Sequence, residues 1–350
     1  MKKNILIVGT GTIGEPLIGL LADFRKKLNI GEIIFHKRTP SIDDAAKVNS
    51  LIKRGAKLAV NEEDNSLFKE LGHKVSYNFQ KALEKADVVV DCTPAGNDHK
   101  KKHYIDYPGK TFIAQGSEKG FGVPYAHGIN DEVLDKKPAF IQVVSCNTHN
   151  IASILSSLDP NIDNIERGDF VCIRRANDIS QEENFIASPK VGSHDSEKFG
   201  THHAKDAYDL FRTKDKFVNI YSSALKVNSQ YMHIIRFNMI VYGYISKEKL
   251  ISRFRENKFV ALSHKTMANK VFSFGRDHGY YGRIFNQTVI SEPTLTVDNL
   301  PGKTRVSGFC FTPQDGNSLL SSIAAAVYGI SEEDHLSKIK LFDNFLFSEI

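Results

Sequence analysis

One cysteine of the 350-residue chain stands where a predicted strand ends and a predicted helix begins. The apolar run that ends at Val144 predicts a buried strand, and apolar residues then recur at helical spacing from Ile151 to Leu158. Cys146 would lie in the first turn of that helix, where backbone N–H groups and the helix dipole favour a thiolate. A thiolate attacks carbonyl carbon, so Cys146 is the candidate nucleophile. The alternative is a small cysteine packed at a strand end.

A glycine-rich turn near the N-terminus is a second group of residues with a chemical use. A strand run from Asn4 to Val8 leads into it, and a helical pattern follows it. Glycines permit a tight turn and let bare backbone approach a pyrophosphate at a helix N-terminus. This context favours a dinucleotide-binding turn over a glycine turn of some other α/β fold. The turn residues are Gly9, Thr10, Gly11, Thr12, Ile13 and Gly14.

The residues after the second predicted strand bear on the choice of dinucleotide. That strand ends at His36, where a strictly NAD-using domain usually offers an acidic residue to the adenosine ribose. The chain has Lys37, Arg38 and Thr39 there. Positive and hydroxyl groups suit a 2′-phosphate, so NADP is expected to be preferred, with NAD also used. The alternative is a basic loop that faces water.

Polar loops follow two further predicted strands of the same domain. Open α/β sheets bind ligands at the carboxyl ends of their parallel strands. Thr93, Pro94 and Gly96 are therefore expected to line the nicotinamide half of the cofactor, after the valine-rich run that ends at Asp91. Further candidates for cofactor contact, after the next strand, are Gln115 and Gly116.

The elements that position these residues divide the chain into three parts. The fold class is α/β, with an N-terminal Rossmann dinucleotide-binding domain and an α+β catalytic domain with a mixed or antiparallel sheet. The predicted domains are residues 1–145 for NAD(P) binding, 146–311 for catalysis and oligomerisation, and 312–350 for a C-terminal helix that returns to the nucleotide domain. Strands of the second part are predicted at 169–173, 217–221, 233–241 and 308–311, and helices at 247–256 and 268–274.

Composition limits the classes of function. The chain carries 46 Lys and Arg against 41 Asp and Glu, which permits a small anionic substrate without favouring nucleic acid. No apolar run reaches the roughly 18 residues of a membrane span, and the N-terminus lacks a signal-peptide pattern, so we expect no membrane partner and a cytoplasmic location. Four widely spaced cysteines without a CxxC pair suit a reducing compartment, and no metal site is expected.

The order of several motifs resembles one family, the archaeal-type (type II) glyceraldehyde-3-phosphate dehydrogenases. The resemblance spans most of the chain up to about residue 240. It rests on the glycine turn, Asp91-Cys92-Thr93-Pro94-Ala95-Gly96, Gln115-Gly116-Ser117-Glu118-Lys119, Val143-Val144-Ser145-Cys146-Asn147-Thr148, Arg174-Arg175-Ala176-Asn177-Asp178, Thr201-His202-His203-Ala204-Lys205-Asp206 and Met232-His233.

The resemblance implies roles for individual residues. Cys146 would be the nucleophile and His233 the base that accepts a proton. Anion and substrate binding would fall to Ser145, Asn147, Thr148, Arg174, Arg175, His202 and His203, and cofactor contact near the C-terminus to Asn317. A homotetramer is the implied assembly.

The chain departs from the family pattern beside the nucleophile. The family usually reads Cys-Asn-Thr-Thr, whereas this chain has His149 after Thr148. A cationic or hydrogen-bonding His149 could replace the missing hydroxyl, so that phosphate still attacks the thioester. A merely bulky His149 would narrow the phosphate site and leave coenzyme A as the acyl acceptor. We favour the first outcome.

The leading hypothesis is a phosphorylating glyceraldehyde-3-phosphate dehydrogenase that uses NADP or NAD and acts through a cysteine thioester. A CoA-acylating semialdehyde dehydrogenase, working as a malonyl-CoA or succinyl-CoA reductase, needs the same cysteine and histidine and remains open. A nucleotide sensor that retains only the Rossmann domain is a third possibility. Fold alone does not decide among them.

Overall fold

The computed structural model describes residues 2–116, 118–177, 186–314 and 316–350. They form two compact units. The first comprises Met1–Tyr125, Glu132–Val143 and Leu319–Leu341, and the second comprises Ala126–Asp131, Val144–Ser318 and Phe342–Ile350. Ser117 and Asp178, which belong to two of the motifs above, lie outside the described residues.

The first unit is built on an eight-stranded sheet whose paired strands all run parallel. Its central strands are short apolar runs buried along their whole length, because helices cover both faces of such a sheet. The strands in spatial order are β4 (Val75–Asn78), β3 (Lys57–Val60), β2 (Ile33–His36), β1 (Ile5–Val8), β5 (Val88–Asp91), β6 (Thr111–Gln115), β8 (Phe140–Val143) and β7 (Val123–Tyr125).

Helices of the first unit come from both ends of the chain. They are α1 (Gly14–Phe24), α2 (Ala45–Lys53), α3 (Asn65–Glu70), α4 (Phe79–Lys85), α5 (Gly96–Lys102), α10 (Leu319–Ile330) and α11 (His335–Ile339). Helix α10 is buried from Leu319 to Gly329 and contacts β5, β6 and β8. Its close approach needs Gly329, where an added Cβ would lie 2.7 Å from the Val88 side chain.

The second unit is built on a mixed sheet. Strands β9 (Ile165–Arg174), β12 (His233–Tyr242) and β16 (Lys303–Thr312) form its antiparallel centre. Parallel pairs lie toward both sides, because β11 runs parallel to β9 and β13 runs parallel to β14. The remaining strands are β10 (Lys190–Val191), β11 (Ile220–Lys226), β13 (Val260–Ser263), β14 (Thr288–Ser291) and β15 (Thr296–Leu300).

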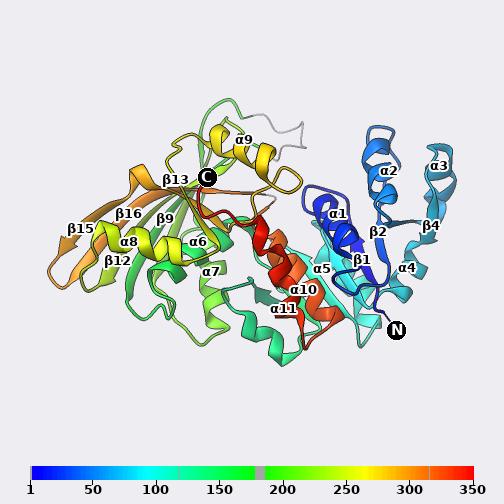
Figure 1. Cartoon of the computed structure of the whole chain (residues 1–350), viewed down its shortest axis with the longest axis horizontal. Coiled ribbons are helices and arrows are strands. Elements are labelled where there is room, and N and C mark those ends of the chain that lie inside the picture. The colour runs from blue at the N-terminus through cyan, green and yellow to red at the C-terminus, as the bar shows by residue number, and fades with distance from the viewer. Residues whose placement is uncertain (1, 117, 178–185, 315) are drawn as a thin grey trace. The chain divides into compact units, whose positions relative to one another are not determined.

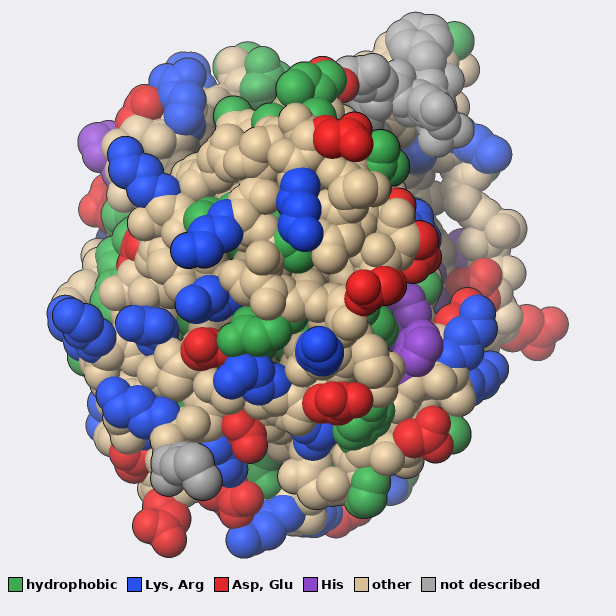
Figure 2. All heavy atoms as spheres, turned by 90° about the vertical axis from the view of Figure 1, so that its right-hand side faces the viewer, with side chains coloured by type: hydrophobic (Ala, Val, Ile, Leu, Met, Phe, Trp, Pro, Cys, Tyr) green, Lys and Arg blue, Asp and Glu red, His purple; other side chains and the backbone are tan. Residues whose placement is uncertain are grey.

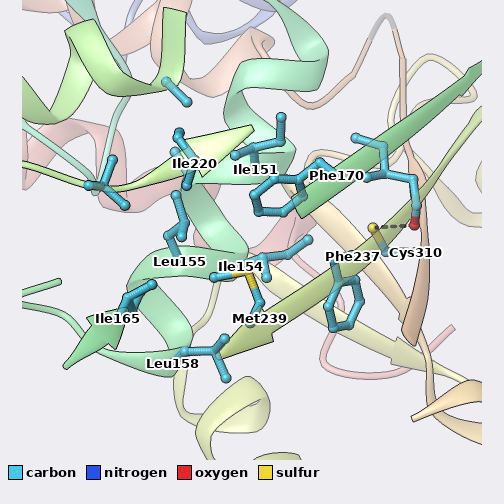
Figure 3. Packing of buried hydrophobic residues seen from close by; sticks show 14 of the residues in the cluster. Ile151, Ile154, Leu155, Leu158, Ile165, Phe170, Ile220, Phe237, Met239 and Cys310 are labelled. Atoms are coloured by element: carbon cyan, nitrogen blue, oxygen red, sulfur yellow. Dashed lines mark hydrogen bonds between the residues drawn. The ribbon is translucent and has the colours of Figure 1, made fainter. Parts of the chain in front are cut away.

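Helices pack against this mixed sheet, with α6 in the middle of the core. They are α6 (Cys146–Leu158), α7 (His202–Arg212), α8 (Lys247–Glu256) and α9 (Ala268–His278) (Figure 1). Side chains of α6 lie among residues of β9, β11 and β12, including Phe170, Ile220 and Phe237 (Figure 3). Asn150 of α6 accepts a hydrogen bond from Cys310 Sγ at 3.2 Å. Cys310 Sγ also contacts the Ile235 carbonyl of β12 at 3.5 Å, which is the dashed line in Figure 3. The start of α6 is therefore anchored to the sheet.

The two sheets confirm the predicted fold class. One predicted strand, at 217–221, is wrong in its bounds, because β11 begins at Ile220 and continues to Lys226. Phe217 lies before the strand with 70% of its surface exposed, and its ring stacks on the Arg212 guanidinium at 3.9 Å. Phe217 thus extends the apolar sequence pattern without belonging to the strand, and its exposed ring contacts a cation instead of the core.

Charged side chains of both signs intermingle on the face drawn in Figure 2. Among the residues that the structure describes, no helix is both long and apolar enough to cross a bilayer.

Candidate active site

Cys146 is the first residue of α6, as the sequence predicts. Ser145 precedes it in extended conformation and caps the helix, since its Oγ accepts a hydrogen bond from the Thr148 N–H at 3.3 Å. The hydroxyls of Ser145 and Thr148 are 2.9 Å apart. Cys146 is partly exposed. The cap therefore holds a reachable thiol at the positive end of a helix dipole.

The other cysteines are poor nucleophiles for a physical reason. Burial raises the pKa of the Cys310 thiol to about 12 and also raises the pKa values of the Cys92 and Cys172 thiols. A thiol with a raised pKa stays protonated at neutral pH and reacts slowly.

His233 is the first residue of β12 and faces Thr312 of β16 in the sheet register. Its backbone N–H donates to Gln314 Oε1 at 3.0 Å, which fixes the strand start. Its ring is buried, and Nδ1 lies 3.2 Å from Asn147 Oδ1. Residue 147 directly follows Cys146, so the structure links the candidate base to the residue beside the candidate nucleophile.

The His233 ring is neutral at ordinary pH. Burial lowers its pKa well below 6.5, and the nearby cations lower it further; these are Arg175, Arg174, His203 and Lys226. A neutral imidazole can accept a proton, which is what a general base must do.

Asn147 also reaches the double-histidine motif on α7. Its Nδ2 is 3.5 Å from Nε2 of His203, which is buried. The adjacent His202 is partly exposed, with its ring centroid 4.0 Å from that of His203 and its Nδ1 3.8 Å from Asp195 Oδ2. The structure thus joins α6, α7 and β12 through a single amide.

The double arginine stands at the end of β9. Arg174 pairs with Lys226 of β11 in the sheet register, so two cations are neighbours. The Arg174 Nε is buried and has no hydrogen-bond partner among the described residues. Arg175 is 3% exposed, and its Nη1 donates to the carbonyl of Tyr231 at 2.9 Å. Closely spaced cations suit an anionic ligand.

His149 contradicts one part of the favoured expectation, which allowed either a cationic or a hydrogen-bonding side chain. The side chain is fully buried, and Nδ1 lies 3.0 Å from the Ser145 carbonyl oxygen. Burial lowers its pKa to about 4, so it is not cationic at neutral pH. Thr148 is also fully buried. His149 therefore stabilises the helix start, and a cationic His149 that replaces the missing hydroxyl is not what the fold presents.

Asn317 contacts the nucleophile's own backbone. Its Nδ2 donates to the carbonyls of Cys146 at 2.9 Å and Gln287 at 3.0 Å. Its Oδ1 is buried and, within the described part of the chain, accepts no hydrogen bond. An orphaned amide oxygen fits a donor such as the carboxamide of a nicotinamide.

The glycine turn of the first unit fits a dinucleotide. Gly9 has φ of +94°, and a Cβ added to Gly14 would lie 2.1 Å from the Gly9 oxygen, so both positions require glycine. A Cβ added to Gly11 would meet nothing within 4 Å, which leaves open space beside exposed backbone. Thr10 is buried, Thr12 and Ile13 are partly exposed, and α1 begins at Gly14. This is the form of a pyrophosphate cradle.

The three residues of the basic loop after β2 differ in their contacts. Lys37 is buried, and its Nζ lies 2.5 Å from Asp44 Oδ2. Lys47 contacts the same carboxylate at 2.6 Å. Arg38 and Thr39 are exposed. Arg38 and Thr39 therefore remain the accessible candidates for a 2′-phosphate, whereas the Lys37 charge already has a partner.

Asp91 is a residue that the sequence analysis missed. This fully buried carboxylate at the end of β5 accepts hydrogen bonds from the Thr93 N–H at 2.9 Å and the Thr93 hydroxyl at 2.6 Å. It also contacts His99 Nδ1 at 2.6 Å and Tyr104 Oη at 2.7 Å. An acidic residue that ends an otherwise apolar strand was the available signal. Asp91 therefore fixes the loop that contains Thr93. The Thr93 methyl group lies so close to Gly9 that it would touch a Cβ added there.

The remaining predicted cofactor residues lie in the first unit, either after β5 or at the end of β6. Pro94 is exposed, and Gly96 is buried at the start of α5. Gln115 ends β6, where its Oε1 accepts a hydrogen bond from Ser322 of α10 at 2.9 Å. Gly116 follows with φ of +65°.

A parallel sheet with a glycine cradle, joined in one chain to a mixed sheet that presents a cysteine and a neutral histidine, defines a dinucleotide-dependent oxidoreductase. No protein-family model matches the chain. Curated proteins named glyceraldehyde-3-phosphate dehydrogenase do match it. That of Sulfolobus acidocaldarius is 27% identical over 304 residues, 84% of each chain. That of Pyrococcus furiosus is 27% identical over 303 residues, 83% of this chain and 84% of the relative.

A third relative is more similar in sequence over a shorter stretch. Glyceraldehyde-3-phosphate dehydrogenase 1 of Methanosarcina acetivorans is 30% identical over 249 residues, 69% of this chain and 68% of the relative. The chain belongs to the archaeal-type glyceraldehyde-3-phosphate dehydrogenase family. It is an oxidoreductase that acts on an aldehyde with a nicotinamide dinucleotide.

Proposed function

We propose that the protein is a phosphorylating glyceraldehyde-3-phosphate dehydrogenase that prefers NADP and acts through a thioester on Cys146. The observation that carries the proposal is the hydrogen-bonded link from Asn147, beside Cys146, to a buried and neutral His233. The names of the relatives point to the same substrate.

The reaction uses Cys146 and His233 in sequence. The Cys146 thiolate attacks the aldehyde carbon and forms a hemithioacetal. His233 accepts the hydroxyl proton of the hemithioacetal as the C–H bond breaks, and a thioester remains on Cys146. When bound in the Gly9–Gly14 cradle, the nicotinamide dinucleotide supplies a hydride acceptor. Proton removal by a positioned histidine contributes about a hundred- to ten-thousandfold in rate.

The cations around His233 would hold the anionic groups of the reaction. Arg174, Arg175 and Lys226, with His203 beside them, all act electrostatically on the His233 ring. A phosphate is recognised well by arginine, which presents a fixed fork of donors. We propose that this cluster binds the substrate phosphate and the phosphate that attacks the thioester.

Preference for NADP is proposed to depend on Arg38 and Thr39. Both are exposed after β2, where the adenosine ribose of a dinucleotide lies in this fold class. Within the described residues Arg38 has no ion pair to lose before it meets a 2′-phosphate, whereas Lys37 would have to leave Asp44.

The cytoplasmic location and the homotetramer remain proposals. Exposed aromatic residues on the mixed sheet support self-association, because Tyr242 of β12 is 50% exposed and Phe309 of β16 is 37% exposed. Light scattering of the purified chain measures the assembly.

A substrate panel tests the proposed function. Glyceraldehyde 3-phosphate, malonyl-CoA and succinyl-CoA are assayed with NADP(H) and NAD(H), with and without inorganic phosphate. We expect phosphate-dependent reduction of NADP with glyceraldehyde 3-phosphate. Reduction of a CoA ester by NADPH, with no response to phosphate, would instead identify an acyl-CoA reductase.

Variants at the cysteines test the nucleophile in the same assay. Cys146→Ala should lose activity while it still binds NADP. Iodoacetamide should label Cys146 before the other three thiols, whose pKa values are raised. Faster labelling of Cys92, together with activity in Cys146→Ala, would show that the nucleophile is misassigned.

A further inference from the structure

The side chain of Asn147 lies between two buried histidines from different elements. Its Oδ1 is 3.2 Å from Nδ1 of His233, and its Nδ2 is 3.5 Å from Nε2 of His203. We propose that Asn147 is a positioning residue that sets the tautomer of His233, keeping the proton on Nδ1 and leaving Nε2 as the base. This inference rests on the proposed function and deepens it, because it names what prepares the base.

The chemistry of the two groups gives the direction. A neutral imidazole has one N–H donor and one acceptor nitrogen, and an amide oxygen can only accept. Nδ1 of His233 faces Asn147 Oδ1, so Nδ1 must carry the proton if the two atoms are hydrogen bonded. The lone pair is then on Nε2, which becomes the atom able to take a proton from the hemithioacetal.

The second histidine determines which way the amide faces. An amide nitrogen can only donate, so Nε2 of His203 must accept from Asn147 Nδ2. A reversed amide would need the opposite tautomer at both rings. His233 would then carry its proton on Nε2 and could not act as a base there. The orientation of one amide therefore decides whether His233 can accept a proton.

The surroundings keep this arrangement fixed. Asn147 is 2% exposed in the first turn of α6, so water does not readily replace either ring as its partner. The hydrogen bond from the His233 backbone N–H to Gln314 Oε1 fixes the main chain from which the ring projects. Arg174, Arg175 and Lys226 disfavour the imidazolium, which leaves the choice of tautomer as the remaining variable.

Nuclear magnetic resonance of the full-length protein tests the proposal without reference to activity. Histidine ring nitrogens are labelled with ¹⁵N, and the His233 signals are assigned by their loss in His233→Gln. At neutral pH we expect a neutral ring with a protonated Nδ1 and an unprotonated Nε2. A proton on Nε2 in the unaltered protein would overturn the proposal.

Substitutions at position 147 separate positioning from structural support. Asn147→Ala should shift His233 toward the Nε2–H tautomer and lower kcat roughly ten- to a hundredfold, with KM for the aldehyde little changed. Asn147→Asp keeps an oxygen acceptor, so Nδ1 should stay protonated. An unchanged His233 tautomer in Asn147→Ala would refute the positioning role.

Asn150 provides a matched control on the same helix. Its buried amide donates to Thr312 Oγ1 at 2.9 Å and to the Phe311 carbonyl at 3.3 Å. Asn150→Ala should lower thermal stability while the His233 tautomer stays as in the unaltered protein. An equal tautomer change in both variants would mean that loosening of α6, and not Asn147, is responsible. If His233→Gln were fully active, the proposed function would be wrong. The tautomer measurement does not depend on activity, so it would still decide the proposal for Asn147.

Discussion

The basic loop after β2 and the double arginine at the end of β9 carry similar residues in different electrostatic settings. In the loop, Lys37 is buried against the Asp44 carboxylate, which also contacts Lys47. At the end of β9, Arg175 donates to the neutral carbonyl of Tyr231, and Arg174 pairs in register with the cationic Lys226. The loop pairs Lys37 with a carboxylate, whereas the end of β9 places Arg174 beside another cation.

This difference shows why basic residues alone do not define an anion site. A buried cation with a carboxylate partner is stable without a ligand, and moving it to a ligand would leave the carboxylate unpaired. Gathered cations repel one another and gain from an anion. The lowered pKa of the His233 ring, caused by burial and then by Arg175, Arg174, His203 and Lys226, records that positive potential. We therefore expect the end of β9 to bind an anion more strongly than the basic loop does.

The largest expected effect comes from comparing a buried histidine of the second unit, His233, with one of the first unit, His36. His233→Asn should lower kcat by about a hundred- to ten-thousandfold, because the general base is lost. His36→Asn, at the end of β2, changes a buried ring that contacts Asn61, and kcat should stay within a few fold. Steady-state kinetics with saturating cofactor measures both. Equal losses would show that His233 acts only through the fold.

Acid should destabilise each of the two units through a buried neutral histidine, His36 in the first and His149 in the second. Burial lowers the pKa values of His36 and His149 to about 4, while an unfolded histidine titrates near 6.5. The unfolded chain thus binds more protons between these values, so stability is full above about pH 6.5 and falls as the pH drops toward 4. Each histidine should contribute a loss of about 3 kcal/mol.

Urea unfolding between pH 7 and pH 4 measures this dependence. His149→Gln should flatten the pH profile of the free energy of unfolding, whatever its effect at pH 7. His264→Gln, at an exposed histidine, is the control and should leave the profile as it is. A profile that His149→Gln does not alter would mean that the ring is not held neutral.

A matched pair of substitutions tests the charge balance itself. Arg175→Met should lower kcat/KM for glyceraldehyde 3-phosphate by roughly ten- to a hundredfold, the loss of one charge-assisted hydrogen bond. The acid limb of the pH–rate profile should also move to higher pH, because one cause of the lowered His233 pKa is removed. Lys37→Met should mainly lower thermal stability. If Lys37→Met impairs catalysis as much as Arg175→Met does, the contrast between the regions is wrong.

The smallest effect concerns cofactor choice. Arg38→Ala should weaken NADP binding by about tenfold and leave NAD binding nearly unchanged, because only NADP carries the 2′-phosphate. Calorimetric titration of both cofactors measures this. Thr39→Ala should have a weaker effect in the same direction. An equal loss for NAD and NADP would show that the loop positions adenosine without reading the phosphate.

Local rules account for what the sequence could predict. The start of α6 at Cys146 follows from the apolar periodicity and a Ser145 cap, and the turn before α1 follows from glycine geometry. Both depend on residues a few positions apart. The presence of a mixed sheet was predicted correctly. The start of β11 was missed because Phe217 is apolar in sequence but lies exposed before the strand, against Arg212.

Contacts between distant segments account for the rest. Asn147 meets His203 and His233, which are 56 and 86 positions away in the chain. The burial of His149 depends on the whole core around α6. A sequence pattern gives residue types but not which side chain shields or neutralises another, so the bridging role of Asn147 could not be predicted.

The measurement that tests the central claim most directly is detection of the acyl-enzyme. The protein is mixed with glyceraldehyde 3-phosphate and NADP without inorganic phosphate, quenched in acid, digested and examined by mass spectrometry. We predict an acyl group on the peptide that contains Cys146, and its release when phosphate is added before the quench. An acyl group on Cys92, Cys172 or Cys310, or one released by coenzyme A and not by phosphate, would contradict the account.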